Sequence, residues 1–353
     1  MYAEAKLSKD EALVVLRSCG AVTATAGRDD NAPDVRSRTA AGVGGVSTAA
    51  DLLQRERRAR RVTTFCKELD DMLGGGVCAG EVTEFSGVPG VGKTQLGMQF
   101  AVDVQIPTLF GGAGGRAIYV DTEGSFIVDR VVDMSDAMIA HLRRVAEAPH
   151  AQPHPSSERR RTIAASMSVD AVLQGIDYFR VHDYTEQIAL IKHLDEFVER
   201  RNAEVPPEQG VKLVVIDSIA FHLRQEFGDV GQRTRILLEL AQALQKLASG
   251  REIAVVVINQ VTTKVYDGGE KSVLAPALGE TWAHCPTTRV ALTWEMDQRV
   301  ARLTKSPSLV SGSAPYVVQE EGIRGLDPGA LGRKRPRQQD DATTNNAPAA
   351  SLS

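Results

Sequence analysis

Short apolar runs alternate with segments of helical spacing along most of this chain. From about residue 62, five runs have the character of strands: EVTEF (81–85), RAIYVD (116–121), DYFRV (177–181), KLVVID (212–217) and EIAVVVIN (252–259). Two segments between them, 185–201 and 232–249, place apolar residues three or four positions apart. Strands that alternate with amphipathic helices predict an α/β fold, with a mainly parallel twisted sheet and helices on both faces.

The pattern changes near the C-terminus. After residue 289, three strand-like runs follow one another closely, RVALTWE, QRVARLTK and APYVVQE. They predict an antiparallel C-terminal extension of the sheet. The stretch 149–166, with several prolines and RRR at 159–161, predicts a surface insertion.

The ends of the chain lack the pattern of the core. Residues 1–19 contain one short helical segment, LSKDEALVVLRS, and residues 20–61 have the composition of a flexible linker whose end is basic and helical. We expect the core to span 62–325. The last segment, 326–353, is polar and basic, and we expect it to be disordered.

Composition narrows the class of protein. Among 353 residues, 42% are hydrophobic and 24% charged, as in ordinary soluble globular proteins. The formal net charge of −4 excludes a whole-protein field that attracts DNA, so DNA contact would need a local basic surface. No apolar run approaches the roughly 20 residues that span a bilayer. The four cysteines lack metal or disulfide spacing, so we expect an intracellular protein with reduced thiols and no membrane partner.

One glycine-rich segment predicts a phosphate site. It matches G-x-x-x-x-G-K-[ST] at every constrained position, and a strand precedes it and a helix follows it. Backbone N–H groups of such a loop point at phosphate oxygens, the lysine reaches the β- and γ-phosphates, and the hydroxyl ligates Mg²⁺. The residues are Gly87, Val88, Pro89, Gly90, Val91, Gly92, Lys93 and Thr94. The segment predicts binding of ATP with Mg²⁺.

Polar residues at three other strand ends fit the same site. Asp217 follows the buried run LVVI and is placed to hold the magnesium. Asp121 or Glu123 would orient or deprotonate the attacking water, and the amide of Gln260 would sense the γ-phosphate. Each has an alternative role as a helix cap or turn residue. Because ligands bind at the carboxyl ends of strands in open α/β sheets, their agreement favours a shared site.

Taken together, these motifs resemble one family. GxxxxGKTQ (87–95), YVDTEGSF (119–126), LVVIDSIAF (213–221) and NQVTTK (259–264) occur in the order typical of the RecA-like strand-exchange recombinases of eukaryotes. AVDVQIP (101–107), DTEGSFIVDRVVD (121–133), PALGETW (276–282) and GRKRPR (332–337) are more similar to the recombinase paralogues of the C type than to the recombinase itself. The resemblance covers about 62–325 and implies a RecA-like P-loop core.

The resemblance implies roles at the nucleotide. Glu123 would activate the hydrolytic water, Gln260 would couple the γ-phosphate to a DNA-binding loop, and Asp217 would hold Mg²⁺ through water. Lys93, Thr94 and Gln95 belong to the nucleotide-binding segment, and Arg130 would lie against the adenine.

The resemblance also implies two disordered loops, roughly 222–233 and 262–280, that contact single-stranded DNA. Their candidate contacts are Arg224, Arg233, Lys264 and Lys271. Acidic residues accompany these cations, so charge alone favours two solvated loops. The basic stretch at 55–61 is likewise typical of a solvated helical face, with DNA contact as the alternative.

Basic residues in the tail predict nuclear localisation. The run Arg333, Lys334, Arg335, Pro336 and Arg337 is typical of a nuclear localisation signal, and a solubilising tail is the alternative. The resemblance favours the signal and a nuclear protein.

Three features depart from an autonomous recombinase. The N-terminal segment resembles only the last helix of the family's small helical domain. No phenylalanine-x-x-alanine docking segment precedes residue 62, so partnership with other paralogues is expected. Lys305 stands where the recombinase carries an aspartate beside a neighbour's ATP, and we hypothesise that its ammonium lies near a γ-phosphate across an interface.

Three functions follow as hypotheses. The first is a DNA-dependent ATPase of homologous recombination, which binds single-stranded or branched DNA in a paralogue complex and assists the recombinase filament. The second is an adaptor that holds ATP without hydrolysing it. The third is a RecA-fold motor of the helicase type, for which no arginine-finger signature is found.

Overall fold

The computed structural model describes residues 48–148, 156–224, 230–266 and 271–326. The chain divides into two compact units at Ala59 and Arg60. Within the first unit, helix α2 (Ala49–Arg58) begins at a capping box in which the hydroxyl of Thr48 accepts from the backbone N–H of Asp51 and Asp51 bonds back to Thr48. This helix is the basic helical end expected for the linker.

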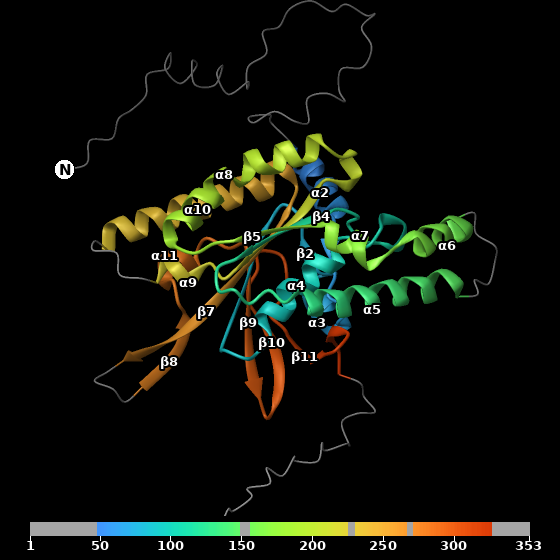
Figure 1. The fold of residues 1–353 in the computed structure, drawn as a ribbon. Coiled ribbons are helices and arrows are strands. Elements are labelled where there is room, and N and C mark those ends of the chain that lie inside the picture. The colour runs from blue at the N-terminus through green and yellow to red at the C-terminus, as the bar shows by residue number, and fades with distance from the viewer. Residues whose placement is uncertain (1–47, 149–155, 225–229, 267–270, 327–353) are drawn as a thin grey trace, which may run out of the picture. The chain divides into compact units, whose positions relative to one another are not determined.

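The second unit is built on one large sheet, with strand order β12-β11-β10-β9-β3-β7-β6-β4-β5 and β8 paired to β7 (Figure 1). The central strands β9, β3, β7, β6, β4 and β5 are parallel. Their bounds are β3 Val82–Gly87, β4 Arg116–Asp121, β5 Ile176–Arg180, β6 Val211–Asp217, β7 Ala254–Tyr266 and β9 Thr288–Glu295. The mainly parallel sheet predicted from the sequence is confirmed.

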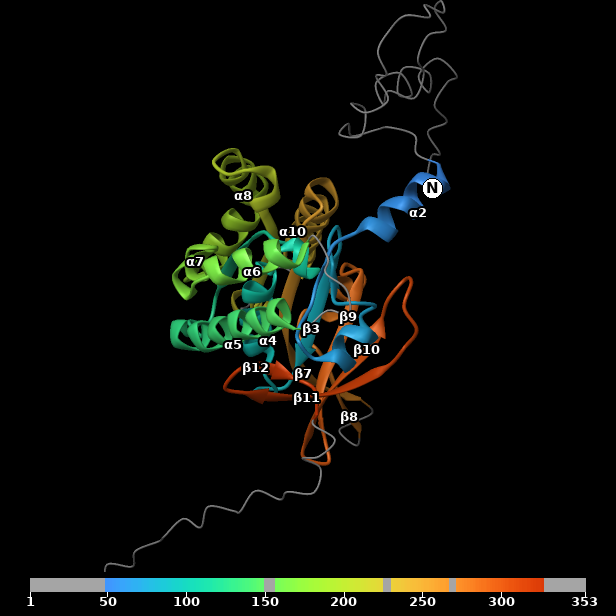
Figure 2. The same cartoon turned by 90° about the vertical axis from the view of Figure 1, so that its right-hand side faces the viewer.

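Antiparallel strands continue the sheet from β9, as Figure 2 shows in orange and red. They are β10 (Gln298–Lys305), β11 (Ser313–Gln319) and β12 (Gly322–Arg324), and they confirm the predicted extension. A separate short pair, β1 (Arg61–Val62) and β2 (Val77–Cys78), flanks α3 (Lys67–Met72).

Helices cover both faces of the sheet (Figure 1). One face carries α4 (Lys93–Asp103), α5 (Val128–Glu147), α7 (Val169–Gln174) and α3. The other carries α8 (Tyr184–Ala203), α9 (Ala220–Leu223), α10 (Val230–Arg251) and α11 (Gly279–Ala283). Short 3₁₀ turns lie at Thr108–Phe110 and Pro207–Gln209.

Strands β3, β7, β6 and β4 each supply both hydrophobic cores. On β6, Leu213 and Val215 face the core beneath α4 and α5, whereas Val214 and Ile216 face the core beneath α8 and α10. Successive side chains of a strand point to opposite faces, so a strand buried on both sides must be apolar throughout. This is why the continuous apolar runs of the sequence are interior strands.

The expected surface insertion is, over its described part, the largely exposed helix α6 (Ser156–Ser166), which packs on α5. Another expectation needs correction. The segment 262–280, expected as a disordered loop, includes the end of β7, strand β8 (Lys271–Pro276) and the start of α11, and β7 and β8 pair in antiparallel register from Val261↔Pro276 to Tyr266↔Lys271. The β-branched run Val261-Thr262-Thr263 favours continuation of the strand.

None of the described helices combines the length and apolar character that crossing a membrane requires.

Candidate functional site

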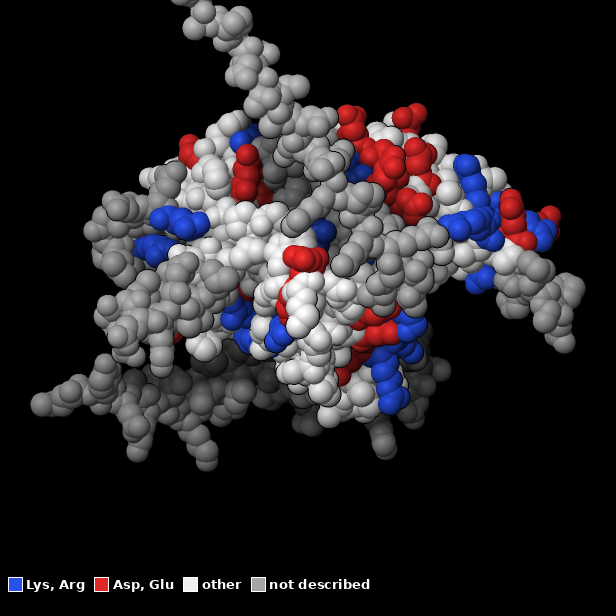
Figure 3. Space-filling model, turned by 90° about the horizontal axis from the view of Figure 1, so that it is seen from below, with Lys and Arg blue, Asp and Glu red and all other residues white. Residues whose placement is uncertain are grey.

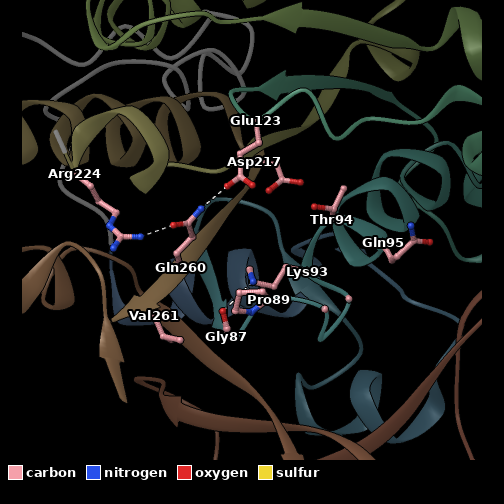
Figure 4. Close-up of a pocket in the computed structure, with 12 residues that line it drawn as sticks. Gly87, Pro89, Lys93, Thr94, Gln95, Glu123, Asp217, Arg224, Gln260 and Val261 are labelled. Atoms are coloured by element: carbon pink, nitrogen blue, oxygen red, sulfur yellow. Dashed lines mark hydrogen bonds between the residues drawn. The ribbon is translucent and has the colours of Figure 1, made fainter. Parts of the chain in front are cut away.

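Four parallel strands bring polar ends to one edge of the sheet. The register pairs Gly87 on β3 with Gln260 on β7, and Asp121 on β4 with Asp217 on β6. A pocket of about 460 Å³ opens at this edge, within the size range of small-molecule sites (Figure 4). Its lining residues are Gly87, Pro89, Gly90, Gly92, Lys93, Thr94, Gln95, Glu123, Asp217, Arg224, Gln260 and Val261.

The glycine-rich segment has the geometry of a phosphate loop. Gly90 and Gly92 have φ of 77° and 102°, a region that side chains disfavour, and Gly92 is the N-cap of α4. A Cβ at Gly87 would lie 2.5 Å from the backbone oxygen of Leu292, so this position also needs glycine. The loop therefore leads directly into the N-terminus of an 11-residue helix, where an anion is favoured.

Lys93 occupies the centre of this loop. Its ammonium donates to the carbonyl oxygens of Gly87 at 2.8 Å and Val88 at 2.9 Å. Burial lowers its pKa, while the nearby carboxylates of Asp217 and Glu123 act in the opposite direction. A phosphate would offer this desolvated cation a charged partner in place of neutral carbonyls.

Thr94 and Asp217 form the candidate magnesium position. Asp217 is 2% exposed, its Oδ2 accepts from the Tyr119 hydroxyl at 2.9 Å, and it lines the same pocket as Thr94. Burial raises the pKa of Asp217 to about 6. The described residues contain no cluster of three protein ligands for a metal. Mg²⁺ commonly takes one or two protein oxygens together with water and phosphate oxygens, and Thr94 and Asp217 are two such oxygen-bearing side chains.

Glu123 lies across the pocket from the loop. Its Oε1 accepts from the Ser218 hydroxyl at 2.6 Å and from the Gln260 amide at 2.7 Å. Both hydrogen bonds therefore end on one carboxylate oxygen. A carboxylate at the rim of a phosphate site is the kind of group that can accept a proton from water.

Asp121 has a structural role in the loop after β4, and not the role of orienting or deprotonating water. Its carboxylate accepts backbone N–H bonds from Glu123, Gly124, Ser125 and Phe126, and it is buried. It therefore shapes the loop that presents Glu123, which agrees with the capping alternative.

Comparison with known proteins identifies the family. Residues 55–147 and 155–326 match the family model described as Rad51. The chain is 41% identical over 322 residues to the DNA repair protein RAD51 homolog 3 of Cricetulus griseus, a match covering 91% of this chain and 82% of the relative. The chain belongs to the Rad51 family. It is a DNA repair and recombination protein of the RecA type.

Other relatives agree with this membership. A RAD51 homolog 3 from Dictyostelium discoideum is 41% identical over 280 residues, covering 79% of this chain and 69% of the relative. The DNA repair and recombination protein RadA of Halobacterium salinarum is 32% identical over 293 residues, covering 82% of this chain and 83% of the relative. The resemblance to C-type paralogues is thereby confirmed. Rad51 and RadA proteins in general bind ATP with Mg²⁺ and are DNA-dependent ATPases.

Arg130 is firmly fixed near the Rad51-type nucleotide site. Its guanidinium donates to Gln95 at 3.1 Å, to Asp133 at 3.0 Å, and to the backbone oxygens of Gln319 at 2.8 Å and Glu320 at 2.6 Å. It thus joins α5 to the turn between β11 and β12 and braces a pocket residue, Gln95. Its contact with adenine stays a prediction.

The predicted DNA contacts lie in different surroundings. Arg224 lines the nucleotide pocket, and Arg233 on α10 donates to the backbone oxygen of Leu223 at 3.2 Å. Lys264 and Lys271 lie on the paired strands β7 and β8. Figure 3 shows basic and acidic side chains interspersed on the face seen from below. A DNA contact on that face would therefore depend on a few cations, and it stays a prediction.

Two further expectations stay predictions. The basic run 333–337 lies outside the described residues. The ammonium of Lys305 donates to the backbone oxygens of His284 at 2.9 Å and Pro286 at 2.7 Å, beyond the C-terminus of α11. In the isolated chain this lysine stabilises that turn.

Sequence reasoning missed Ser218 and Tyr119 as residues of the site, and it assigned Arg224 to DNA rather than to the nucleotide pocket. Ser218 and Tyr119 hold Glu123 and Asp217 in place, and Arg224 reaches Gln260. Ser218 follows Asp217 directly, which was the available signal. Nothing in the sequence places Tyr119 or Arg224, because their neighbours are 98 and 36 positions away.

Proposed function

We propose that this chain is an Mg²⁺-dependent ATPase whose turnover responds to single-stranded DNA. The observation that supports this proposal is the convergence of Lys93, Asp217 and Glu123 on one pocket from three strand ends. A phosphate cradle, a metal-holding carboxylate and a carboxylate placed to act as a base are the parts that hydrolysis of a γ-phosphate needs.

The chain's own groups divide the reaction among them. Backbone N–H groups of residues 87–94 and the Lys93 ammonium would hold the β- and γ-phosphates. Thr94 and Asp217 would hold Mg²⁺, which when bound neutralises charge on the phosphate oxygens. Glu123 would orient a water in line with the γ-phosphate and accept its proton on a carboxylate oxygen. Fixed donors around the phosphate would supply most of the rate acceleration.

The test is ATP turnover of the purified protein with and without an oligothymidylate. We expect turnover that rises with DNA, and Lys93→Ala and Glu123→Gln should each abolish it. Retained nucleotide without turnover, with Glu123→Gln behaving as the unaltered protein, would instead establish the adaptor. A closed ring seen by mass measurement would favour the helicase-type motor.

We also propose that the chain acts with other recombinase paralogues on single-stranded or branched DNA, and assists the recombinase filament. The similarity to the RAD51 homolog 3 proteins supports this. Co-expression with candidate paralogues followed by mass measurement tests it, and a chain that remains alone with every paralogue contradicts it.

Nuclear location is part of the same proposal. It is supported by the DNA repair names of the relatives and by the basic run 333–337. Imaging of a tagged chain tests it. Replacing Lys334 and Arg335 by alanine should shift the protein to the cytoplasm, and unchanged nuclear signal would assign import to another segment.

A further inference from the structure

A short chain of hydrogen bonds crosses the nucleotide pocket. The Arg224 guanidinium donates to the Gln260 side-chain oxygen at 2.6 Å, and the Gln260 amide nitrogen donates to Glu123 Oε1 at 2.7 Å (Figure 4). The three residues come from the end of α9, from β7 and from the loop after β4. All three line the same pocket as Lys93.

The two charged neighbours fix the direction of the Gln260 amide. A guanidinium can only donate hydrogen bonds, and a carboxylate can only accept them. The amide must therefore turn its oxygen to Arg224 and its nitrogen to Glu123. In this arrangement the oxygen of the amide is held by Arg224 and its nitrogen by Glu123, so the amide cannot turn toward a phosphate without breaking these bonds.

The same arrangement occupies Glu123. The amide nitrogen of Gln260 and the hydroxyl of Ser218 both donate to Oε1. An oxygen that accepts two hydrogen bonds has both of its lone pairs in use and cannot accept another from a water molecule. The chain from Arg224 to Glu123 thus corresponds to a resting state of the site.

Arg224 is the member of this chain most open to competition. Its side chain is exposed, and its partner in the chain is a neutral amide oxygen. Charge-assisted bonds from a guanidinium to a phosphate are bidentate and roughly twice as strong as those to neutral acceptors. A phosphate that reaches Arg224 would therefore displace Gln260.

We propose that Arg224 is a phosphate-responsive latch that holds Gln260 on Glu123 until a phosphate takes the guanidinium. Arg224 acts as a positioning residue, through Gln260. The inference rests on the proposed ATPase function. Two sources supply the same chemistry, the bound nucleotide and a nucleic-acid backbone.

The test compares Arg224→Ala and Arg224→Lys with Arg161→Ala, a control that removes an exposed arginine of α6 far from the pocket lining. Three quantities are measured for each: affinity for fluorescent MgATPγS, ATP turnover alone, and ATP turnover with an oligothymidylate. Loss of one hydrogen bond of this kind should change the measured affinity or turnover by about fivefold or more.

The two sources give different results. If the DNA backbone opens the latch, Arg224→Ala keeps its MgATPγS affinity, turns over about fivefold faster without DNA, and gains little from DNA. If the nucleotide opens it, Arg224→Ala loses about fivefold in MgATPγS affinity, and turnover changes by the same factor with and without DNA. In both cases Arg224→Lys should restore much of the original behaviour, because a lysine can also donate to Gln260 and bind phosphate.

Other outcomes overturn the latch. Affinity and both turnover values within twofold of the control would show that Arg224 has no such role. Equal loss of both turnover values with unchanged affinity and no recovery in Arg224→Lys would indicate general damage to the site. A protein whose turnover ignores DNA contradicts the proposed function, and the MgATPγS arm alone then decides the latch.

Discussion

Two glutamates, one on β3 and one in the loop after β4, have opposite surroundings. Glu84 on β3 is 0% exposed, and its oxygens accept from Asn259 at 2.7 Å, Trp282 at 2.8 Å and Arg289 at 2.6 Å. Glu123 is exposed at the pocket rim, and its two hydrogen bonds end on the same oxygen.

The difference separates structural from chemical carboxylates. A buried charge is tolerated only when it is paired and hydrogen-bonded, and the partners of Glu84 come from β7, α11 and β9. Its network joins the strand that leads into the phosphate loop to the elements around it. Glu123 remains open to solvent on one side, which a group that must take a proton from water requires.

The largest effect is expected at Glu84. Glu84→Ala would leave the Arg289 guanidinium, 16% exposed, without its carboxylate. Removing one partner of a buried ion pair costs about 3–5 kcal/mol, so the free energy of unfolding should fall by that amount. Urea denaturation measures it. A loss below about 1 kcal/mol would show that the network is dispensable.

Glu123→Gln tests the other half of the comparison. ATP turnover should fall by about 100-fold or more, which is the contribution of a positioned general base, while urea denaturation shows stability within about 0.5 kcal/mol of the original. Lys192→Gln, at an exposed ion pair on α8, serves as the surface control. A strong loss of stability in Glu123→Gln would show that Glu123, like Glu84, has a structural role.

Trp282→Phe is expected to have a smaller effect at the buried network. The indole nitrogen donates to Glu84 Oε1, and Trp282 is 1% exposed, so phenylalanine removes one donor and some buried volume. We expect a loss of about 1–3 kcal/mol in unfolding free energy. Trp294→Phe, at a tryptophan that is 45% exposed, should cost far less in the same measurement.

The smallest effect concerns pH. Burial raises the pKa of Asp70 to about 6 from 3.8, although Thr64 donates to it through its backbone N–H and its hydroxyl. The folded state binds this proton more tightly than the unfolded state, so stability should fall as pH rises from about 4 to about 6 and then level off. After discounting for partial exposure we expect about 1–2 kcal/mol.

Asp70→Asn checks that assignment, because the amide oxygen can still accept from Thr64 while the titration is removed. Thermal unfolding across pH 4–7 should show a shallower slope for the variant than for the original protein. Identical slopes would assign the pH dependence to other buried acids, of which Asp103 is one whose pKa burial raises well above its usual value.

The sequence by itself determined the interior of the sheet and the chemistry at its edge. Apolar runs such as 212–217 are typical of buried strands. The residue types that a phosphate loop requires are so restricted that the order of residues from Gly87 to Thr94 identifies the loop. The strand-end residues Asp217, Glu123 and Gln260 were found because parallel strands must place their carboxyl ends together.

Only the tertiary structure decided which long-range partners these groups have. The hydrogen bond from Tyr119 to Asp217, the three partners around Glu84 and the hydrogen bond from Arg224 to Gln260 join residues from separate elements. The hairpin of β7 and β8 was missed for the same reason, since its polar, mixed sequence has no strong period and pairing supplied the structure. The pattern of apolar and polar residues in a segment indicates which backbone structure that segment prefers. Which side chains pair across the fold depends on the three-dimensional arrangement of distant segments, which such a pattern does not contain.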